Sequence, residues 1–173
     1  TGVQTCALPI SDMPEYTAGL NTGFSWKNFD FSMQWTGAWN VDRMLDEFRR
    51  PLGDTNEKGL LLYQYDTTWR SSADTFTAKF PRTSSLHASN NYAGSDLYLI
   101  NASYLRLKSV EIGYNFNFPF MKKLKMDNCR LYVNGYNLIT ITGFKWGDPE
   151  SRQSSRPNYP LTRVFNIGLK LGF

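Results

Sequence analysis

Apolar residues recur at every second position along several stretches of the chain, which is the period of an extended β-strand. In residues 161–173 one set of alternate positions is apolar or aromatic apart from Arg163, and the other set is mostly polar or small. Taken alone, this strand suits a soluble sandwich and a membrane barrel equally well, because periodicity does not separate them. The apolar set comprises Leu161, Phe165, Ile167, Leu169, Leu171 and Phe173.

The same alternation occurs in residues 16–26, 29–39, 109–118 and 130–141. Only Lys27 and Asn28 separate the first two stretches, so we expect a two-residue turn and an antiparallel hairpin with Trp26 opposite Phe29. The apolar positions of both strands then share one face. The pattern predicts an antiparallel sheet with one apolar and one polar face.

Strand length favours a membrane barrel over a soluble sheet. The eleven residues of 29–39 rise about 25 Å along the membrane normal when tilted near ~45°, whereas strands of globular sheets usually have ~5 or 6 residues. Aromatic residues stand at both ends of the first two strands, as the aromatic girdles of a barrel would place them. These residues are Tyr16, Trp26, Phe29 and Trp39.

Two places depart from the regular alternation. Leu105 and Leu107 are out of phase with Val110, which predicts a β-bulge or a strand portion above the bilayer. Farther along, Tyr136 and Leu138 fall on the polar face and Asn137 on the apolar face.

Short and long connections alternate between the strands: residues 27–28 and 119–128 are turns, and residues 40–102 and 143–160 are long. Outer-membrane barrels keep short turns on the periplasmic side and long loops outside. We therefore expect two long extracellular loops, with Phe173 at the periplasmic rim. Arg163 then lies near the outer interface, where a lipid-facing charge costs about 0–1 kcal/mol instead of about 2–4 kcal/mol at the midplane.

The first long connection begins with apolar residues at helical spacing. Val41, Leu45 and Phe48 follow Asn40, a candidate N-cap, and Pro51 would end the helix. We therefore predict a short helix over residues 41–50.

Composition agrees with a barrel. Of the 173 residues 16% are aromatic, the mean hydropathy is −0.44, and no apolar run approaches the ~18 residues of a membrane helix. The net charge is +4, but the basic residues are scattered, with one tight group at Lys122, Lys123 and Lys125, which argues against nucleic-acid binding.

Residues 1–10, TGVQTCALPI, match the in-frame translation of a common sequencing-library adapter. They also lack the basic n-region of a signal peptide, so we exclude them and expect residues 11–173 to be the native part, beginning mid-gene. Cys129 is then the remaining cysteine, and neither a disulfide nor a cysteine-based metal site is predicted.

Several segments resemble the C-terminal end of the SusC/RagA group of TonB-dependent outer-membrane transporters. They are NASYLRLKSVEIGYNF, CRLYVNGYNLITITGF, DPES and YPLTRVFNIGLKLGF, and PEYTAGLNTGFSWKNFDFSMQWTGAW resembles the preceding hairpin. The resemblance implies an all-β fold, an antiparallel transmembrane barrel of about 22 strands. Residues 11–173 would supply about the last five strands as an open, curved sheet, without the plug, the TonB-contacting segment and the N-terminal strands.

The resemblance also implies a function and partners. The complete protein would import glycans or peptides across the outer membrane of a Gram-negative bacterium, energised through TonB and assisted by a SusD-like surface lipoprotein. A C-terminal signal for the barrel assembly machinery would comprise Asn166, Gly168, Leu171 and Phe173. Trp69, Tyr92 and Trp146 in the long loops are candidates for stacking on a sugar ligand.

No catalytic constellation is evident, and neither enzymatic activity nor a cofactor is predicted. His87, the one histidine, would need Ser84, Ser85 or Ser89 and Asp74 or Asp96 from the same loop to form a hydrolytic triad, and a solvated histidine is the simpler interpretation. The alternatives are another outer-membrane barrel such as a porin, an outer-membrane hydrolase that uses His87, and a soluble β-sandwich binding module. Glu111 on the polar face either lines a solute path or simply makes the inner wall of the barrel hydrophilic.

Overall fold

The computed structural model describes residues 13–45, 62–74, 77–83, 91–117, 126–151 and 161–173. These residues fall into two compact units. One unit is built from residues 13–41, 102–151 and 158–173, and the other contains residues 42–101. Each unit is described by itself.

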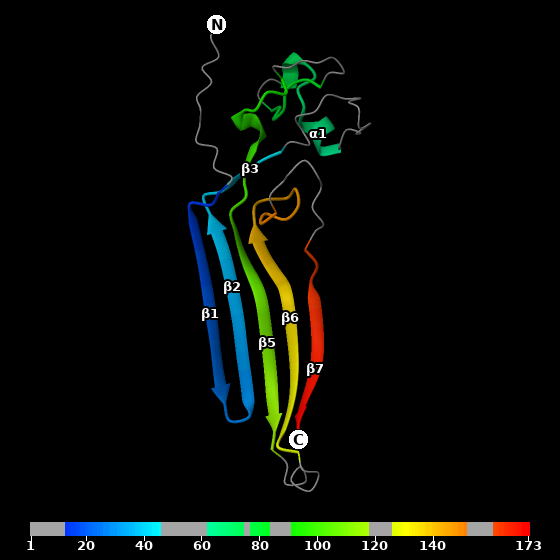
Figure 1. The fold of residues 1–173 in the computed structure, drawn as a ribbon. Helices are drawn as coiled ribbons and strands as arrows, with labels where there is room; N and C mark the ends of the chain where they lie inside the picture. Colours follow the sequence, from blue (N-terminus) through cyan, green and yellow to red (C-terminus); the bar gives the residue numbers. More distant parts are fainter. Residues whose placement is uncertain (1–12, 46–61, 75–76, 84–90, 118–125, 152–160) are drawn as a thin grey trace. The chain divides into compact units, whose positions relative to one another are not determined.

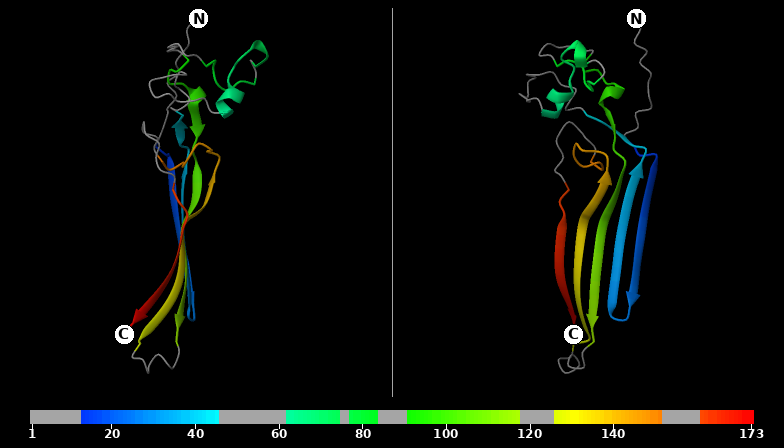
Figure 2. Two further views of the ribbon diagram at one scale, coloured as in Figure 1. Left: turned by 90° about the vertical axis from the view of Figure 1, so that its right-hand side faces the viewer. Right: turned by 180° about the vertical axis from the view of Figure 1, so that it is seen from behind.

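The first unit is a five-stranded sheet in the order β1-β2-β5-β6-β7, with every neighbouring pair antiparallel (Figure 1). Seen edge-on, its strands cross as the sheet twists (Figure 2). Strands β1 and β7 form its two edges. The predicted all-β, antiparallel, open sheet is confirmed. The strands are β1 (Tyr16–Trp26), β2 (Phe29–Trp39), β5 (Tyr104–Phe116), β6 (Asn128–Thr142) and β7 (Val164–Gly172).

The β1–β2 hairpin has the predicted bounds and register. Trp26 lies opposite Phe29, and the pairing continues to Tyr16 opposite Trp39 without interruption. The two-residue turn begins at Lys27, whose φ of 53° is left-handed. Such turns require a positive φ because their twist must match that of the strands. The predicted connection is therefore confirmed.

A bulge near Lys108 explains the change of phase in β5. The register shifts between Gln34 and Trp35 in the pairing with β2, and between Leu107 and Ser109 in the pairing with β6. One extra residue in a strand brings two side chains of opposite phase to the same face. Leu107 and Val110 consequently both lie on the apolar face, so the predicted bulge is confirmed.

The expectation that Leu138 lies on the polar face is wrong. Asn137 has a left-handed φ of 55°, and the kink turns the following side chain toward the apolar face. A Cβ placed on Gly135, which lies opposite Val110 on that face, would stand 2.8 Å from Leu138 Cδ2. Asn137 tolerates this backbone conformation better than most residues, and its Nδ2 donates a hydrogen bond to the Thr162 carbonyl at 3.3 Å.

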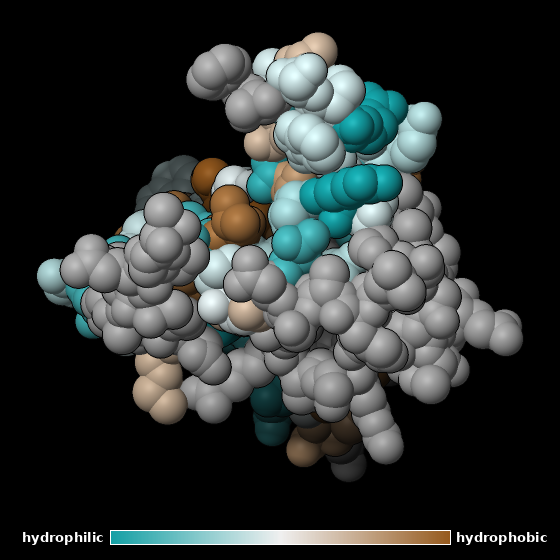
Figure 3. Space-filling model, turned by 90° about the horizontal axis from the view of Figure 1, so that it is seen from above, coloured by the Kyte–Doolittle hydropathy of each residue, from teal (hydrophilic) through white to brown (hydrophobic). Residues whose placement is uncertain are grey.

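The two faces of the sheet differ sharply in chemistry. In the described part of the chain, large residues on the apolar face remain exposed to solvent. The exposed fraction is 71% for Phe165 and 78% for Ile167. Figure 3 colours the described residues by hydropathy, and both hydrophilic and hydrophobic residues are visible in that view. None of the helices in the described ranges has the length and apolar character needed to cross a membrane.

The second unit contains a two-stranded antiparallel pair, β3 (Asp42–Met44) with β4 (Leu99–Asn101), and the helix α1 (Leu62–Thr67). Two short 3-10 helices span Ser72–Asp74 and Asp96–Tyr98. Phe80 packs between two tyrosine rings, at 6.3 Å from that of Tyr63 and 5.8 Å from that of Tyr98. Phe80 and Tyr98 are buried together with Leu45, and these are the buried apolar residues described in this unit.

The predicted helix over residues 41–50 is wrong for its first part, and residues 46–50 lie outside the described residues. Residues 42–44 are extended as β3, and Asn40, with a left-handed φ of 55°, follows the end of β2 instead of capping a helix. The Leu45 amide donates to the Tyr98 carbonyl at 2.9 Å. Pairing with a distant segment thus overrides the local helical spacing.

A tight turn closes the segment after α1. The backbone amides of Arg70 and Ser71 both donate to the Asp74 carboxylate, at 3.2 Å and 3.0 Å. Hydrogen bonds to the charged form, that from Ser71 foremost, hold the pKa of Asp74 below its usual value.

Candidate functional site on the polar face of the sheet

A network of charged and amide side chains crosses the polar face from β2 to β7. Its members come from four strands that the register brings together. Arg130 of β6 lies opposite Asn115, Glu111 of β5 lies opposite Asn134, and Asn134 lies opposite Asn166 of β7. The sixth member is Asp30 of β2, which lies opposite Gly113.

Arg130 is the centre of this network. Its guanidinium binds the Asp30 carboxylate through both Nε, at 3.2 Å from Oδ1, and Nη2. The same Nη2 donates to Glu111 Oε1 at 2.7 Å. One cation therefore neutralises two carboxylates that would otherwise repel each other across the sheet. Charge-assisted hydrogen bonds of this kind are stronger than neutral ones.

Gly113 gives the guanidinium room to cross β5. A Cβ at this position would stand 2.5 Å from Arg130 Nη2 and 2.5 Å from Asp30 Oδ2. Real Cβ atoms are not found so close to other heavy atoms, so a side chain here would displace the ion pair. The ion pair in its present position therefore needs a glycine here.

Amide side chains extend the network to both sides. Asn115 Nδ2 donates to Asp30 at 3.2 Å, Asn134 Nδ2 donates to Glu111 at 3.4 Å, and Asn166 Nδ2 donates to Asn134 at 2.9 Å. Glu111, which the sequence placed on the polar face without a role, is thus paired inside the network. The arrangement is a continuous hydrogen-bonded network of polar side chains that runs across four strands.

A second cluster surrounds Arg106, whose side chain is only 2% exposed. Its Nη2 donates to both oxygens of Asp148 at 2.8 Å and 2.9 Å, and its Nη1 donates to Glu150 at 2.7 Å. Its Nε donates to Thr140 at 3.1 Å, and the guanidinium stands 5.4 Å from the Tyr104 ring centre. The two carboxylates belong to the connection after β6, so Arg106 ties that connection to the polar face of the sheet.

Sequence reasoning did not single out Arg106 or Arg130. A usable signal was present, because Arg106 and Arg130 both lie at polar-face positions of amphipathic strands, where a partner must satisfy a buried charge. Finding the partners of Arg130 requires the cross-strand register, which the bulges at Lys108 and Asn137 shift. The carboxylates that bind Arg106 lie in the connection after β6.

The residues of the expected assembly signal occupy both faces of β7. Asn166 and Gly168 lie on the polar face, where the Tyr132 ring covers Gly168 so closely that a Cβ would overlap it. Leu171 lies on the apolar face, and Phe173 follows the strand with 81% of its surface exposed.

The three loop aromatics belong to two different units. Trp69 and Tyr92 are half-buried in the second unit, where the Trp69 amide donates to the Phe80 carbonyl at 2.9 Å. Trp146 is half-buried in the unit that holds the sheet. His87, Ser84, Ser85 and Ser89 lie outside the described residues.

Within the part of the chain that the structure describes, no group of three or more histidine, cysteine, aspartate or glutamate residues could hold a metal ion. Cys129 is a half-buried free thiol on β6.

Long antiparallel strands with one exposed apolar face and one hydrogen-bonded polar face define the wall of an outer-membrane β-barrel. Comparison with known proteins agrees. Residue identity is 29% with the TonB-dependent receptor P3 of Formosa agariphila, covering 92% of this chain and 16% of that protein. It is 28% with the TonB-dependent receptor SusC of Bacteroides thetaiotaomicron, covering 90% of this chain and 15% of that protein.

Solved structures show the same fold. The RagAB peptide importer in its closed-closed state superimposes with a TM-score of 0.72 at 21% identity, covering 96% of this chain and 18% of that chain. The open-open state gives a TM-score of 0.70 with the same coverage. No protein-family model matches the chain.

The chain is thus similar over most of its length to the C-terminal part of a SusC/RagA-like TonB-dependent receptor. It spans about a sixth of the length of the curated relatives that it matches.

Proposed function

We propose that residues 11–173 form the C-terminal wall segment of an outer-membrane transporter that imports glycans or peptides with energy supplied through TonB. The observation that carries this proposal is the sheet itself: strands β1 and β2 of eleven residues each, an exposed apolar face, and a fold shared with the RagAB peptide importer over 96% of the chain. The wall has no chemistry to perform, and its polar face borders the solute path.

The orientation follows from the connections. The chain leaves the sheet by long connections after β2 and β6, at one end, and by short ones after β1 and β5, at the other (Figure 1). Since outer-membrane barrels carry their long loops outside the cell, the connection held by Arg106 would face the exterior. Phe173 would then stand at the periplasmic rim.

Three partners belong to this proposal. A SusD-like surface lipoprotein would cover the extracellular loops, and the TonB complex would act on a segment of the complete receptor other than residues 11–173. The barrel assembly machinery would recognise β7 through Asn166, Gly168, Leu171 and Phe173. In support, β7 is an edge strand: among the described residues it pairs only with β6, and its other edge carries no strand. A closing strand requires such an open edge.

The test is uptake by cells that carry the complete receptor. Growth on the glycan or peptide should stop when the receptor gene is deleted, and it should stop equally when TonB is removed. Uptake that persists without TonB would contradict the proposal and favour a porin. Hydrolysis of the solute at the cell surface, lost in His87→Ala, would instead indicate an enzyme.

Ligand contact by Trp69, Tyr92 and Trp146 stays a prediction. Aromatic side chains stack on sugar rings, and all three residues are half-buried rather than fully packed away. Each should be replaced by alanine in the complete receptor and ligand affinity measured by calorimetry. A position at which the affinity is unchanged has no role in binding.

A further inference from the structure

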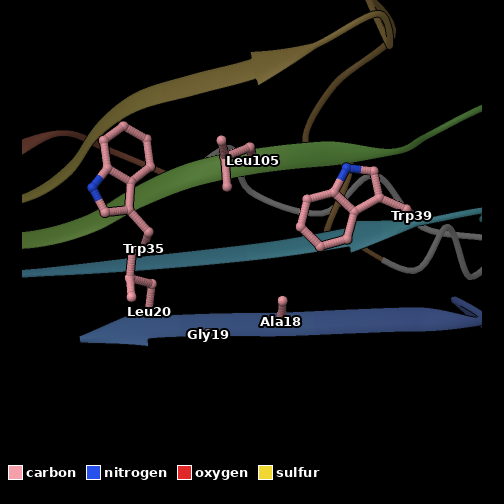
Figure 4. Close-up of a pocket in the computed structure, with 6 residues that line it drawn as sticks. All are labelled: Ala18, Gly19, Leu20, Trp35, Trp39 and Leu105. Carbon is pink, nitrogen blue, oxygen red and sulfur yellow. The ribbon is translucent and has the colours of Figure 1, made fainter. Parts of the chain in front are cut away.

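The apolar face of the sheet is not smooth: a groove of about 310 Å³ crosses it over β1, β2 and β5. Its walls are the rings of Trp35 and Trp39, with smaller apolar side chains between them (Figure 4). The remaining lining residues are Ala18, Gly19, Leu20 and Leu105.

The groove lies where a row of cross-strand partners contains two small residues, Ala18 and Gly37, between rows of larger side chains. Ala18 of β1 lies opposite Gly37 of β2, which in turn lies opposite Leu105 of β5. Trp35 and Trp39 project from the same face two residues before and two residues after Gly37. The Trp39 ring leans back over Gly37, where a Cβ would stand 2.7 Å from Trp39 Cη2. The open part of the groove therefore lies beside Ala18 and Gly19 of β1, between the two indole rings.

The groove is continuous with the exposed apolar face that meets lipid in the proposed barrel. Its lining is apolar, whereas a stably bound water needs two to four polar partners, so water is a poor occupant. The volume is about ten times the ~30 Å³ that a water molecule takes up in the liquid. A segment of hydrocarbon chain fits this space, and inside the membrane the surrounding solvent is made of such chains.

We propose that this groove is a binding site for one acyl chain of a membrane lipid, held between Trp35 and Trp39. The inference rests on the proposed barrel. The new element is that one lipid chain is bound at a defined position, whereas the lipids on the rest of the apolar face exchange freely. The indole rings gain dispersion contacts with the acyl chain, and the small residues Ala18 and Gly19 leave space for it.

Filling the groove tests the proposal. In the complete receptor, Ala18→Phe would place a ring in the groove, and Val133→Phe would add the same ring to the apolar face on β6, away from the groove. The receptor is purified in mild detergent with dipalmitoyl phosphatidylethanolamine, and native mass spectrometry counts the phospholipids retained. We expect the wild type and Val133→Phe to keep one phospholipid that Ala18→Phe loses, with at least a fivefold lower retained fraction.

A second measurement serves if Ala18→Phe does not fold. Phospholipid with a brominated acyl chain quenches tryptophan fluorescence on contact, and we expect the saturable part of this quenching to disappear in Trp35→Phe with Trp39→Phe. Equal retention in all variants, or quenching that rises only in proportion to bulk lipid, would overturn the proposal. So would a loss of receptor dimers without loss of lipid, since that result assigns the groove to a second copy.

The outcome is separable from that of the proposed function. TonB-dependent uptake is measured in the same strains, and Ala18→Phe should retain it because the groove lies on the face opposite to the solute path. Uptake that depends on TonB together with unchanged lipid retention overturns the groove alone.

Discussion

On the polar face, the loss of Arg130 would leave two carboxylates without their shared cation. In Arg130→Met, Asp30 and Glu111 would face each other unneutralised, although both remain partly open to water. We expect the free energy of unfolding of the complete barrel to fall by about 1–2 kcal/mol, the range for hydrogen bonds to charged groups after allowance for solvent. Denaturant titration in detergent measures it.

The matched control removes all three charges together. Adding Asp30→Asn and Glu111→Gln to Arg130→Met leaves no unpaired charge on the wall, and much of the lost stability should return. If the triple variant were less stable than Arg130→Met, the carboxylates would not be the source of the loss.

Gly113 offers a sharper test at the same scale, because a single added methyl group should disturb the network. The Cβ of Gly113→Ala would press against the Arg130–Asp30 ion pair, whereas the nearest atom to a Cβ on Gly19, also on the polar face, is 3.9 Å away. We expect Gly113→Ala to lower the denaturation midpoint and Gly19→Ala to leave it unchanged or raise it. Equal effects of the two substitutions would show that the crossing of β5 does not depend on space at Gly113.

At the scale of single elements, alternation predicted β1 and β2 to the residue and the bulge in β5. It failed where backbone irregularity or distant pairing decides the outcome. The left-handed backbone of Asn137 turns Leu138 onto the apolar face. The period-two alternation of apolar residues does not reveal such a change. The β3 segment shows apolar residues at helical spacing, yet its backbone pairs with β4, more than fifty residues away.

The candidate site was harder to predict than the strands. Glu111 and Asn166 were placed on the correct face from the pattern, but their partners depend on which rung of one strand meets which rung of the next. The partners of Arg106 are harder still to predict, because Asp148 and Glu150 lie more than forty residues farther along the chain and outside any helix or strand.

The segment after β6 owes its position to Arg106. In Arg106→Leu the carboxylates of Asp148 and Glu150 would lose their main cation, and we expect residues 143–151 to exchange backbone hydrogens at least tenfold faster. Lys108→Ala is the control, because Lys108 is 45% exposed and approaches Glu150 only to 3.6 Å. Hydrogen exchange with mass spectrometry in the complete receptor measures both. Unchanged protection in Arg106→Leu would mean that other contacts hold the segment.

On the scale of the whole molecule, five strands form a sheet that has two edges and one apolar face without a covering layer in the described residues. Unpaired strand edges template further pairing, and exposed apolar surface drives association. We therefore expect the chain, expressed alone, to aggregate without detergent and to show no transport activity. Light scattering after removal of detergent measures this, and a monodisperse soluble monomer would count against the account.

The central claim is that the odd-numbered positions of β2 face lipid and the even-numbered positions face the interior of a barrel. Spin labels placed one at a time at residues 29–39 of the complete receptor in lipid vesicles, with its native cysteines including Cys129 replaced, report contact with oxygen dissolved in the bilayer. Oxygen accessibility should alternate with a period of two along the strand and be high at positions 29, 31, 33 and 35. Accessibility that is uniform along β2, or highest at positions 30, 32 and 34, would contradict the placement of this sheet in a membrane wall.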